Sequence, residues 1–137
     1  MEQKKIGIAL SGGAARGFAH LGVLKALKEN DIPIDFISGT SAGSIAGAAF
    51  ASGLSVEEIA EIGRKMSWFK MTGFSYSAKG LLSNASMGEF FRKEFPVQTF
   101  EELKTPFAAV ACDLETGEEV VLKADDLIGA IRASCAI

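Results

Sequence analysis

The sequence predicts an α/β protein in which a mostly parallel sheet is flanked by helices, and three observations support this fold class. Short apolar runs alternate along the chain with segments that carry apolar residues at helical spacing. Two of these runs lead into glycine-containing turns and then into a helix, as strands of a parallel sheet do. With 137 residues and 48% hydrophobic content, the chain is large enough for one core. We therefore expect a single domain over residues 1–137.

The first half of the chain contains two strand–turn–helix units. Residues 5–10 predict a strand, which a glycine-rich loop connects to a helix. The apolar positions of this helix are Phe18, Leu21, Leu24 and Leu27. Residues 34–37 predict a short buried strand, and the alanine-rich residues 44–51 predict the helix that follows it. Ser55-Val56-Glu57-Glu58 has the pattern of a capping box, which predicts a third helix to about Lys65.

The second half continues the alternation. A helix is predicted over residues 87–94, with Ser86 as its N-cap. Pro106 precedes a strand over residues 107–112, and the turn that follows leads into a strand over residues 119–122, which together predict a hairpin. Asp125 and Asp126 precede the last helix, where negative charge favours the N-terminus.

Charge and cysteine content narrow the class of protein. The net charge of −3 and a pI near 5.2, with no basic stripe, argue against a nucleic-acid partner. Cys112 and Cys135 do not have metal-binding spacing, and residues 1–5 do not resemble a signal peptide. We interpret both cysteines as reduced core thiols and expect a cytoplasmic location. Residues 36–56 carry no charge, but glycines and serines divide them into strand, turn and helix, which favours tight packing over a membrane span.

The pentapeptide Gly39-Thr40-Ser41-Ala42-Gly43 is the strongest functional signal. Gly-x-Ser-x-Gly between a strand and a helix is typical of a nucleophile elbow, a tight turn that exposes a catalytic serine. Gly39 and Gly43 are expected where side chains would collide with neighbouring backbone. The first amides of the helix would favour negative charge at the Ser41 oxygen. Taken alone, the pentapeptide is also compatible with an unrelated turn of small residues.

The loop over residues 11–17, Ser-Gly-Gly-Ala-Ala-Arg-Gly, can offer backbone N–H groups to an anion, either a phosphate or an oxyanion. Two phosphate-binding motifs fail on spacing. Ala14 stands where a dinucleotide fingerprint needs its second glycine, and Phe18-Ala19 stand where a Walker A loop needs Lys-Ser/Thr. We therefore expect Gly12, Gly13 and Ala14, together with Arg16, to form an oxyanion hole.

Together, the two motifs resemble those of the patatin-like phospholipase family, which carries Gly-Gly-Gly-x-Arg-Gly after its first strand and Gly-x-Ser-x-Gly after its second. The matching residues are Gly12, Gly13, Ala14, Arg16 and Gly17, then Gly39, Ser41 and Gly43. Ala14 is the one departure in the first motif, and it is harmless if its backbone dihedrals are ordinary. The likeness continues through residues 20–24, 111–118 and 131–134. It implies a three-layer patatin-like fold and a serine-dependent lipid acyl hydrolase with no metal or organic cofactor.

The resemblance also implies a Ser-Asp dyad whose aspartate lies in an Asp-Gly segment. No Asp-Gly dipeptide occurs among the aspartates Asp31, Asp35, Asp113, Asp125 and Asp126. We therefore expect residues 1–137 to lack the C-terminal part of the domain and to be nearly inactive alone, with an exposed sheet edge or face that favours a homodimer. The alternative is a catalytically inactive module that binds lipid or a protein partner.

Four features carry competing interpretations. His20, the only histidine, is interpreted as a buried, hydrogen-bonded residue rather than a base. Arg16 is interpreted as organising the loop or meeting a lipid phosphate, the alternative being a plain surface charge. The aromatic residues 68–76 are interpreted as core, the alternative being a lid that transiently contacts a membrane surface. Asp113 is the candidate base if residues 1–137 are active by themselves.

Overall fold

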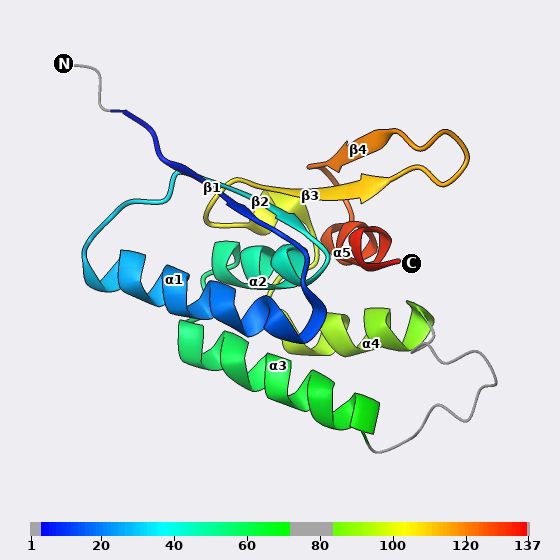
Figure 1. Ribbon diagram of the computed structural model, residues 1–137, viewed down its shortest axis with the longest axis horizontal. Helices are drawn as coiled ribbons and strands as arrows, with labels where there is room; N and C mark the ends of the chain where they lie inside the picture. Colours follow the sequence, from blue (N-terminus) through cyan, green and yellow to red (C-terminus); the bar gives the residue numbers. More distant parts are fainter. Residues whose placement is uncertain (1–3, 72–83, 137) are drawn as a thin grey trace.

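The computed structural model describes residues 4–71 and 84–136, without the side chains of residues 68–71 and 84–85, and its strands and helices alternate as predicted (Figure 1). The strands are β1 (Gly7–Leu10), β2 (Phe36–Thr40), β3 (Phe107–Cys112) and β4 (Glu119–Leu122). The α-helices are α1 (Phe18–Glu29), α2 (Ala42–Ala51), α3 (Val56–Met71), α4 (Asn84–Glu94) and α5 (Leu127–Cys135). Two short 3₁₀ helices are η1 (Ala14–Gly17) and η2 (Phe100–Glu102).

The four described strands form one sheet in the order β1-β2-β3-β4. The first three strands are parallel and β4 is antiparallel to β3, which confirms the mostly parallel sheet with a hairpin. Leu10 pairs with Gly39, and Thr40 pairs with Val110. Because parallel strands end at the same edge of a sheet, the loop after β1 and the turn after β2 are neighbours.

The described helices lie on one side of this sheet (Figure 1). Helices α2 and α5 pack directly on the strands, and α1, α3 and α4 pack mainly on other helices. Burial alternates along the strands accordingly. Leu10, Ile37 and Ala109 are buried against the helices, whereas Phe36 remains 45% exposed, so the predicted strand at residues 34–37 is buried on one face only. No described helix covers the opposite face of the sheet.

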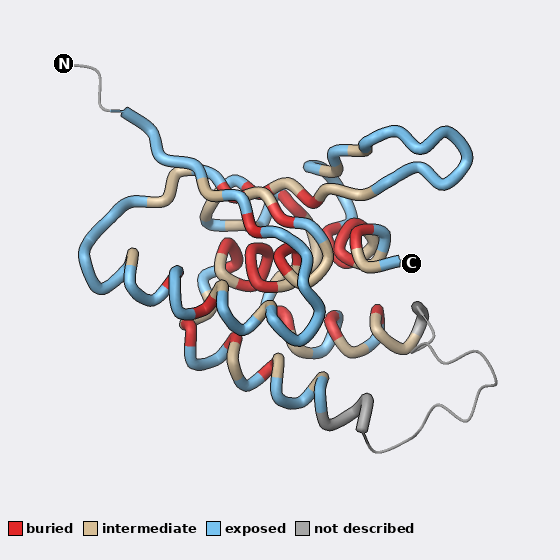
Figure 2. Tube along the Cα trace, viewed as in Figure 1, coloured by how far each residue is buried: buried red, intermediate tan, exposed pale blue. Residues whose placement is uncertain are grey.

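Helix α2 occupies the centre of the core, between the sheet and the outer helices (Figure 2). Ala48, Ala49 and Ala51 have no exposed surface. A Cβ atom at Gly47 would lie 3.0 Å from the Ile37 and Phe107 side chains, so the small residues of α2 allow close approach to the sheet. This central position explains why the segment carries no charge. None of the described helices combines the length and hydropathy that a membrane crossing requires.

Helix boundaries agree with the prediction where a cap is visible in the sequence. The Ser55 N–H donates to Glu58 Oε2 (2.7 Å) and the Glu58 N–H donates to Ser55 Oγ (3.2 Å), as in a capping box. Asp126 is the N-cap of α5, and its side chain accepts from the Gly129 N–H. Helix α4, however, begins at Asn84, so Ser86 lies in its first turn and is not its N-cap.

The predictions for the two cysteines, for the end of the third helix and for the aromatic segment have different outcomes. Cys112 is exposed at the end of β3, so the prediction that it is a core thiol was wrong, whereas Cys135 is half-buried and packs against the core. Neither Cys112 nor Cys135 forms a disulfide. Helix α3 continues past Lys65 to Met71. The aromatic residues 68–76, for which core packing is predicted with a lid as the alternative, lie outside the residues whose side chains are described.

Candidate active site

Ser41 lies on the turn between β2 and α2, with φ 50° and ψ −119°. A residue with a Cβ atom rarely adopts a positive φ, and such a conformation costs on the order of 1–3 kcal/mol unless the surroundings impose it. The strand-to-helix position and the unusual backbone are those expected from the Gly-x-Ser-x-Gly pattern. The Ser41 carbonyl accepts from the Ser44 N–H (2.8 Å) and the Ser44 hydroxyl (2.7 Å), so the first turn of α2 closes on this residue.

The two glycines of the pentapeptide stand where no side chain fits. A Cβ atom on Gly43 would overlap the carbonyl oxygen of Leu10, and one on Gly39 would overlap the carbonyl oxygen of Gly43. The backbone of α2 therefore contacts the end of β1 directly. This contact places the Ser41 turn against the loop that follows β1.

Ser134 of α5 connects the Ser41 turn to the neighbouring strand. The Ser41 N–H donates to Ser134 Oγ (2.9 Å), and the Ser134 hydroxyl donates to the Val110 carbonyl of β3 (2.6 Å). Ser134 is 8% exposed. Sequence reasoning assigned no role to this serine. The sequence did contain a signal for this role, namely a polar residue on the apolar face of the last helix. A polar group that is buried there is expected to form a hydrogen bond.

The glycine-rich loop approaches Ser41 closely. A Cβ atom on Gly12 would lie 3.5 Å from the Ser41 Cβ, which is ordinary van der Waals contact. A Cβ atom on Gly17 would lie 2.8 Å from the Ala42 Cβ, so the loop can adopt this position only with a bare backbone there. The structure thus brings together residues of the two motifs that sequence analysis treated separately.

Ala14 does not have the ordinary dihedrals under which it was expected to be harmless. Its φ is 47°, in the left-handed region where an L-residue costs about 1–2 kcal/mol. The glycine that the family carries at this position is therefore the residue that this backbone favours. The nearby Arg16 closes the same turn, because its N–H donates to the Gly13 carbonyl (2.9 Å), and its side chain is exposed.

His20 holds the beginning of this loop. Its Nε2 lies 2.8 Å from the Ser11 carbonyl oxygen, and because a carbonyl only accepts, Nε2 carries the hydrogen. His20 is therefore hydrogen-bonded, as predicted, although it is half-buried rather than buried. The bond joins the first turn of α1 to the end of β1.

Asp113 belongs to the β3–β4 turn. Its Oδ1 accepts from the Glu115 N–H (2.8 Å) and the Thr116 N–H (3.1 Å). The hydrogen bonds from Thr116 and Glu115 lower the pKa of this carboxyl below its ordinary value, which makes the carboxylate a weaker proton acceptor. Asp113 also lies three residues beyond Val110, the partner of Thr40, so the chain has already left the paired region next to Ser41.

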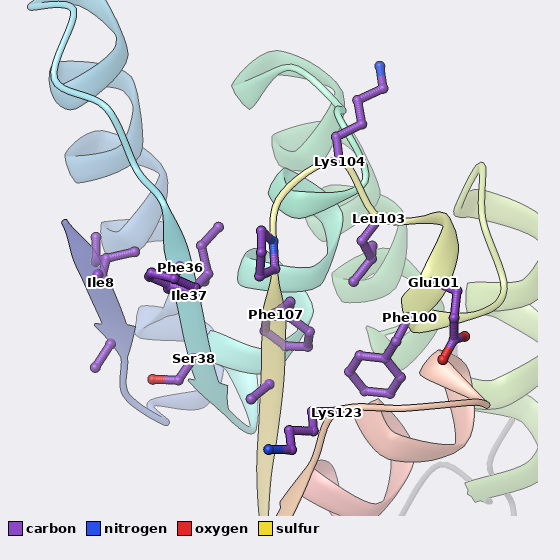
Figure 3. Close-up of a pocket in the computed structure, with 14 residues that line it drawn as sticks. Ile8, Phe36, Ile37, Ser38, Phe100, Glu101, Leu103, Lys104, Phe107 and Lys123 are labelled. Carbon is purple, nitrogen blue, oxygen red and sulfur yellow. The ribbon is translucent and has the colours of Figure 1, made fainter. Parts of the chain in front are cut away.

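Two cavities differ in their relation to this site. One of about 890 Å³ lies over the amino-terminal halves of the strands, where Phe36 and Phe107 begin β2 and β3 (Figure 3). Ser41 follows the carboxyl end of β2 and therefore lies at the opposite edge of the sheet. The other cavity, of about 60 Å³, has Ala14 and Ala42 in its wall and adjoins the Ser41 turn.

A mostly parallel sheet packed against helices, with a serine of positive φ between a strand and a helix and a glycine-rich loop beside it, places the chain among the α/β proteins. The family model described as patatin-like phospholipase matches residues 8–137. The chain therefore belongs to the patatin-like phospholipase family.

Relatives with similar sequences are longer proteins. An uncharacterized NTE family protein of Mycobacterium tuberculosis is 35% identical over 136 residues, which cover 97% of this chain and 38% of that protein. A patatin-like phospholipase domain-containing protein of Caenorhabditis elegans is 31% identical over 140 residues, which cover 96% of this chain and 10% of that protein. The chain thus spans well under half the length of these relatives.

Solved structures show the same fold at low sequence identity. VipD from Legionella pneumophila superposes with a TM-score of 0.66 and 13% identity, over 93% of this chain and 42% of that chain. ExoU from the type III secretion system of Pseudomonas aeruginosa, in complex with SpcU, superposes with a TM-score of 0.60 and 20% identity, over 98% of this chain and 39% of that chain.

Proposed function

We propose that this chain supplies the nucleophile and the oxyanion-binding loop of a serine-dependent lipid acyl hydrolase that uses a Ser-Asp dyad. The observation that carries the proposal is the positive-φ backbone of Ser41 packed against Gly12. A nucleophile must be held rigidly in a reactive geometry, and hydrogen bonds from Ser44 and to Ser134 fix this turn on two sides. Membership of the patatin-like phospholipase family supports a lipid ester as the substrate.

In the proposed reaction, Ser41 Oγ attacks the carbonyl carbon of a fatty acyl ester and its proton passes to the dyad aspartate. The amides of Gly12, Gly13 and Ala14 donate to the oxyanion, and the loss of one such donor costs roughly 3 kcal/mol in other acyl-transfer enzymes. Collapse of the tetrahedral intermediate breaks the bond to the alcohol, which leaves with the proton from the aspartate. Water then gives one proton to the aspartate and attacks the acyl-serine, and the aspartate returns this proton to Ser41 Oγ as the fatty acid is released. The steps need no metal or organic cofactor.

The dyad aspartate is assigned to a part of the protein outside residues 1–137. Two described groups that can accept a proton, His20 and Asp113, are hydrogen-bonded to backbone groups outside the Ser41 turn. His20 donates through Nε2 to the Ser11 carbonyl, and the Asp113 carboxylate accepts two amides of its own turn. Both contacts favour a base from another segment of the protein.

Substitution of Ser41 by alanine tests this proposal. In the protein as its gene encodes it, Ser41→Ala is expected to reduce hydrolysis of short-chain p-nitrophenyl esters by about 10³-fold or more and to abolish labelling by a fluorophosphonate. The Tm should stay close to that of the wild type, because loss of one hydroxyl at a half-buried position changes stability little. Ser38→Ala is the matched control, since Ser38 lies on the same strand and faces away from α2. Full activity of Ser41→Ala would overturn the proposal.

One observation supports a second candidate function, that of a catalytically inactive binding module. Ala14 occupies a left-handed position where the family carries glycine, so the loop departs from the family pattern at a proposed oxyanion donor. A catalytically inactive module that binds lipid or a protein partner would tolerate this change. Wild-type protein that neither hydrolyses the esters nor reacts with the fluorophosphonate would favour that function.

The proposed setting is the cytoplasm, with transient contact to a membrane surface during turnover. The exposed, free thiol of Cys112 supports a reducing compartment. A lipid substrate supports the contact with a membrane surface.

A further inference from the structure

A small apolar cavity lies between η1, α1, α2 and α3. Its volume is about 60 Å³, several times the ~10–15 Å³ that a single water molecule needs by the same measure. Every residue in its wall is glycine, alanine or a larger apolar residue, and the larger ones include Phe18, Leu21, Ile59, Ile62 and Met66. Because none of the described residues in the wall has a polar side chain, water in this open cavity gains no side-chain hydrogen bond from it.

The position of the cavity links it to the proposed site. Ala42, in its wall, directly follows Ser41, and Ala14, also in its wall, is one of the proposed oxyanion donors. Gly17 packs against Ala42 at the same place, because a Cβ on Gly17 would lie 2.8 Å from the Ala42 Cβ. The cavity is therefore continuous with the walls of the site.

We propose that this cavity receives the hydrocarbon chain of the acyl group while its carbonyl is held at Ser41. The inference rests on the proposed function and adds where the acyl chain goes and what limits its length. Moving a methylene from water into an apolar cavity is favourable, and a polar acyl group gains no partner in this wall. The cavity therefore selects an unsubstituted hydrocarbon chain.

The larger cavity is not suited to this role. Its wall contains the charged side chains of Glu101, Lys104 and Lys123, and it lies over the amino-terminal halves of the strands (Figure 3). An acyl chain attached at Ser41 starts from the carboxyl edge of the sheet. The small apolar cavity is at the correct edge and has the correct chemistry.

Met66 limits how far a chain can extend toward the outer end of the cavity. On α3, Ile59 and Ile62 are 4% and 5% exposed and form the inner wall, whereas Met66 is half-buried and borders the solvent side. Phe18 borders the same side, because its ring packs on the bare backbone of Gly63, where a Cβ would lie 2.7 Å from Phe18 Cζ. An unbranched methionine fills irregular space and is readily replaced, so position 66 can be shortened or enlarged.

The test compares kcat/KM for p-nitrophenyl butyrate and octanoate in the protein as its gene encodes it. Met66→Ala makes room for about two methylenes, each of which multiplies kcat/KM by roughly four when buried, so the octanoate-to-butyrate ratio is expected to rise by about tenfold. Met66→Trp closes the same space and is expected to lower the ratio. Labelling rates with a short and a long alkyl fluorophosphonate should shift in the same directions.

Met87→Ala is the matched control, because Met87 is another half-buried methionine that packs against the core, on α4 and outside the cavity wall. The octanoate-to-butyrate ratio of kcat/KM in Met87→Ala should equal that of the wild type. Unchanged ratios in the Met66 variants, with activity still lost in Ser41→Ala, would overturn this inference and leave the proposed function standing. Activity retained in Ser41→Ala would instead overturn the proposed function. If one Met66 variant fails to fold, the ratio of the other decides.

Discussion

The backbone of Ser41 adopts a conformation that is unfavourable by on the order of 1–3 kcal/mol, so other residues must hold it. Ser134 is suited to this task because its hydroxyl accepts from the Ser41 N–H and donates to the Val110 carbonyl. A single buried oxygen thus satisfies a donor of the turn and an acceptor of the adjacent strand. Removing it would leave two backbone groups without this partner.

Ser134→Ala is expected to lower the free energy of unfolding by about 1–3 kcal/mol, the usual cost of leaving buried polar groups unsatisfied. Labelling of Ser41 by a fluorophosphonate should also slow, because the turn can relax from its reactive geometry. Urea unfolding and labelling kinetics measure the two effects. Ser52→Ala is the control, since the buried Ser52 hydroxyl bonds only within its own helix, to the Ala49 carbonyl (2.6 Å), and should leave labelling unchanged. Wild-type stability and labelling in Ser134→Ala would contradict the assignment.

The sequence could predict the conformation of these residues only where a local motif determines it. The turn at Ser41 was predictable because the residues that fix it, Gly39 and Gly43, are close to it in the chain. Ser134 is 93 residues away from Ser41, so its bond depends on how α5 packs on β3 and leaves no local pattern. The conformation of Ala14 was not predictable either, because alanine is the wrong residue to indicate a left-handed backbone.

Among the elements, α2 and β1 approach each other backbone to backbone at Gly43, and this contact sets the position of the site. Gly43 permits it, because any Cβ there overlaps the Leu10 carbonyl oxygen. Helix propensity acts in the opposite direction, since glycine inside a helix is about 1 kcal/mol less favourable than alanine. The steric term must therefore exceed the propensity term at this position.

Gly43→Ala and Gly22→Ala should accordingly have opposite effects on stability. Gly43→Ala forces α2 away from β1 and is expected to cost about 3 kcal/mol or more. Gly22 is exposed in the middle of α1, and a Cβ atom there would meet no other part of the protein within 4 Å, so Gly22→Ala should stabilise the protein by about 0.5–1 kcal/mol. Chemical denaturation measures both, and soluble yield reports on Gly43→Ala if it does not fold. Stabilisation by both substitutions would show that propensity, not contact, decides.

The boundaries of helices and strands were predictable where a proline or a turn residue lies next to them in the chain. Pro106 and the turn at Gly117 delimit β3 and β4, and both strands have the bounds expected from the sequence. The 3₁₀ helix η2 was missed, although Thr99 and Glu102 form a capping box in which the Thr99 N–H donates to Glu102 Oε2 (3.0 Å). The Thr-x-x-Glu pattern was available as a signal. For α4, the sequence predicts Ser86 as the N-cap, whereas the helix begins two residues earlier, at Asn84.

For the whole molecule, the two faces of the sheet differ in their cover. Val110 pairs with Val121 and Ser38 pairs with Ala108, so these residues share the face that lies away from α2. On this face Phe36 is 45% exposed and Val121 is 50% exposed, and the Lys5 ammonium lies 5.4 Å from the centre of the Phe36 ring. Figure 2 shows buried residues concentrated on the helical side of the sheet. An apolar face of this kind favours association.

Residues 1–137 expressed alone are therefore expected to self-associate through this face, and the double substitution Phe36→Lys, Val121→Lys should shift the population to monomer. Burying one such side chain is worth about 1.5–3 kcal/mol, whereas two facing lysines would repel. Analytical ultracentrifugation over a range of concentrations measures the shift. Leu114→Lys is the matched control, because Leu114 is 87% exposed but lies on the β3–β4 turn, off the paired strands. A wild-type segment that stays monomeric at every concentration, or a Leu114 variant that dissociates as readily as the double variant, would rule out this face as the site of association.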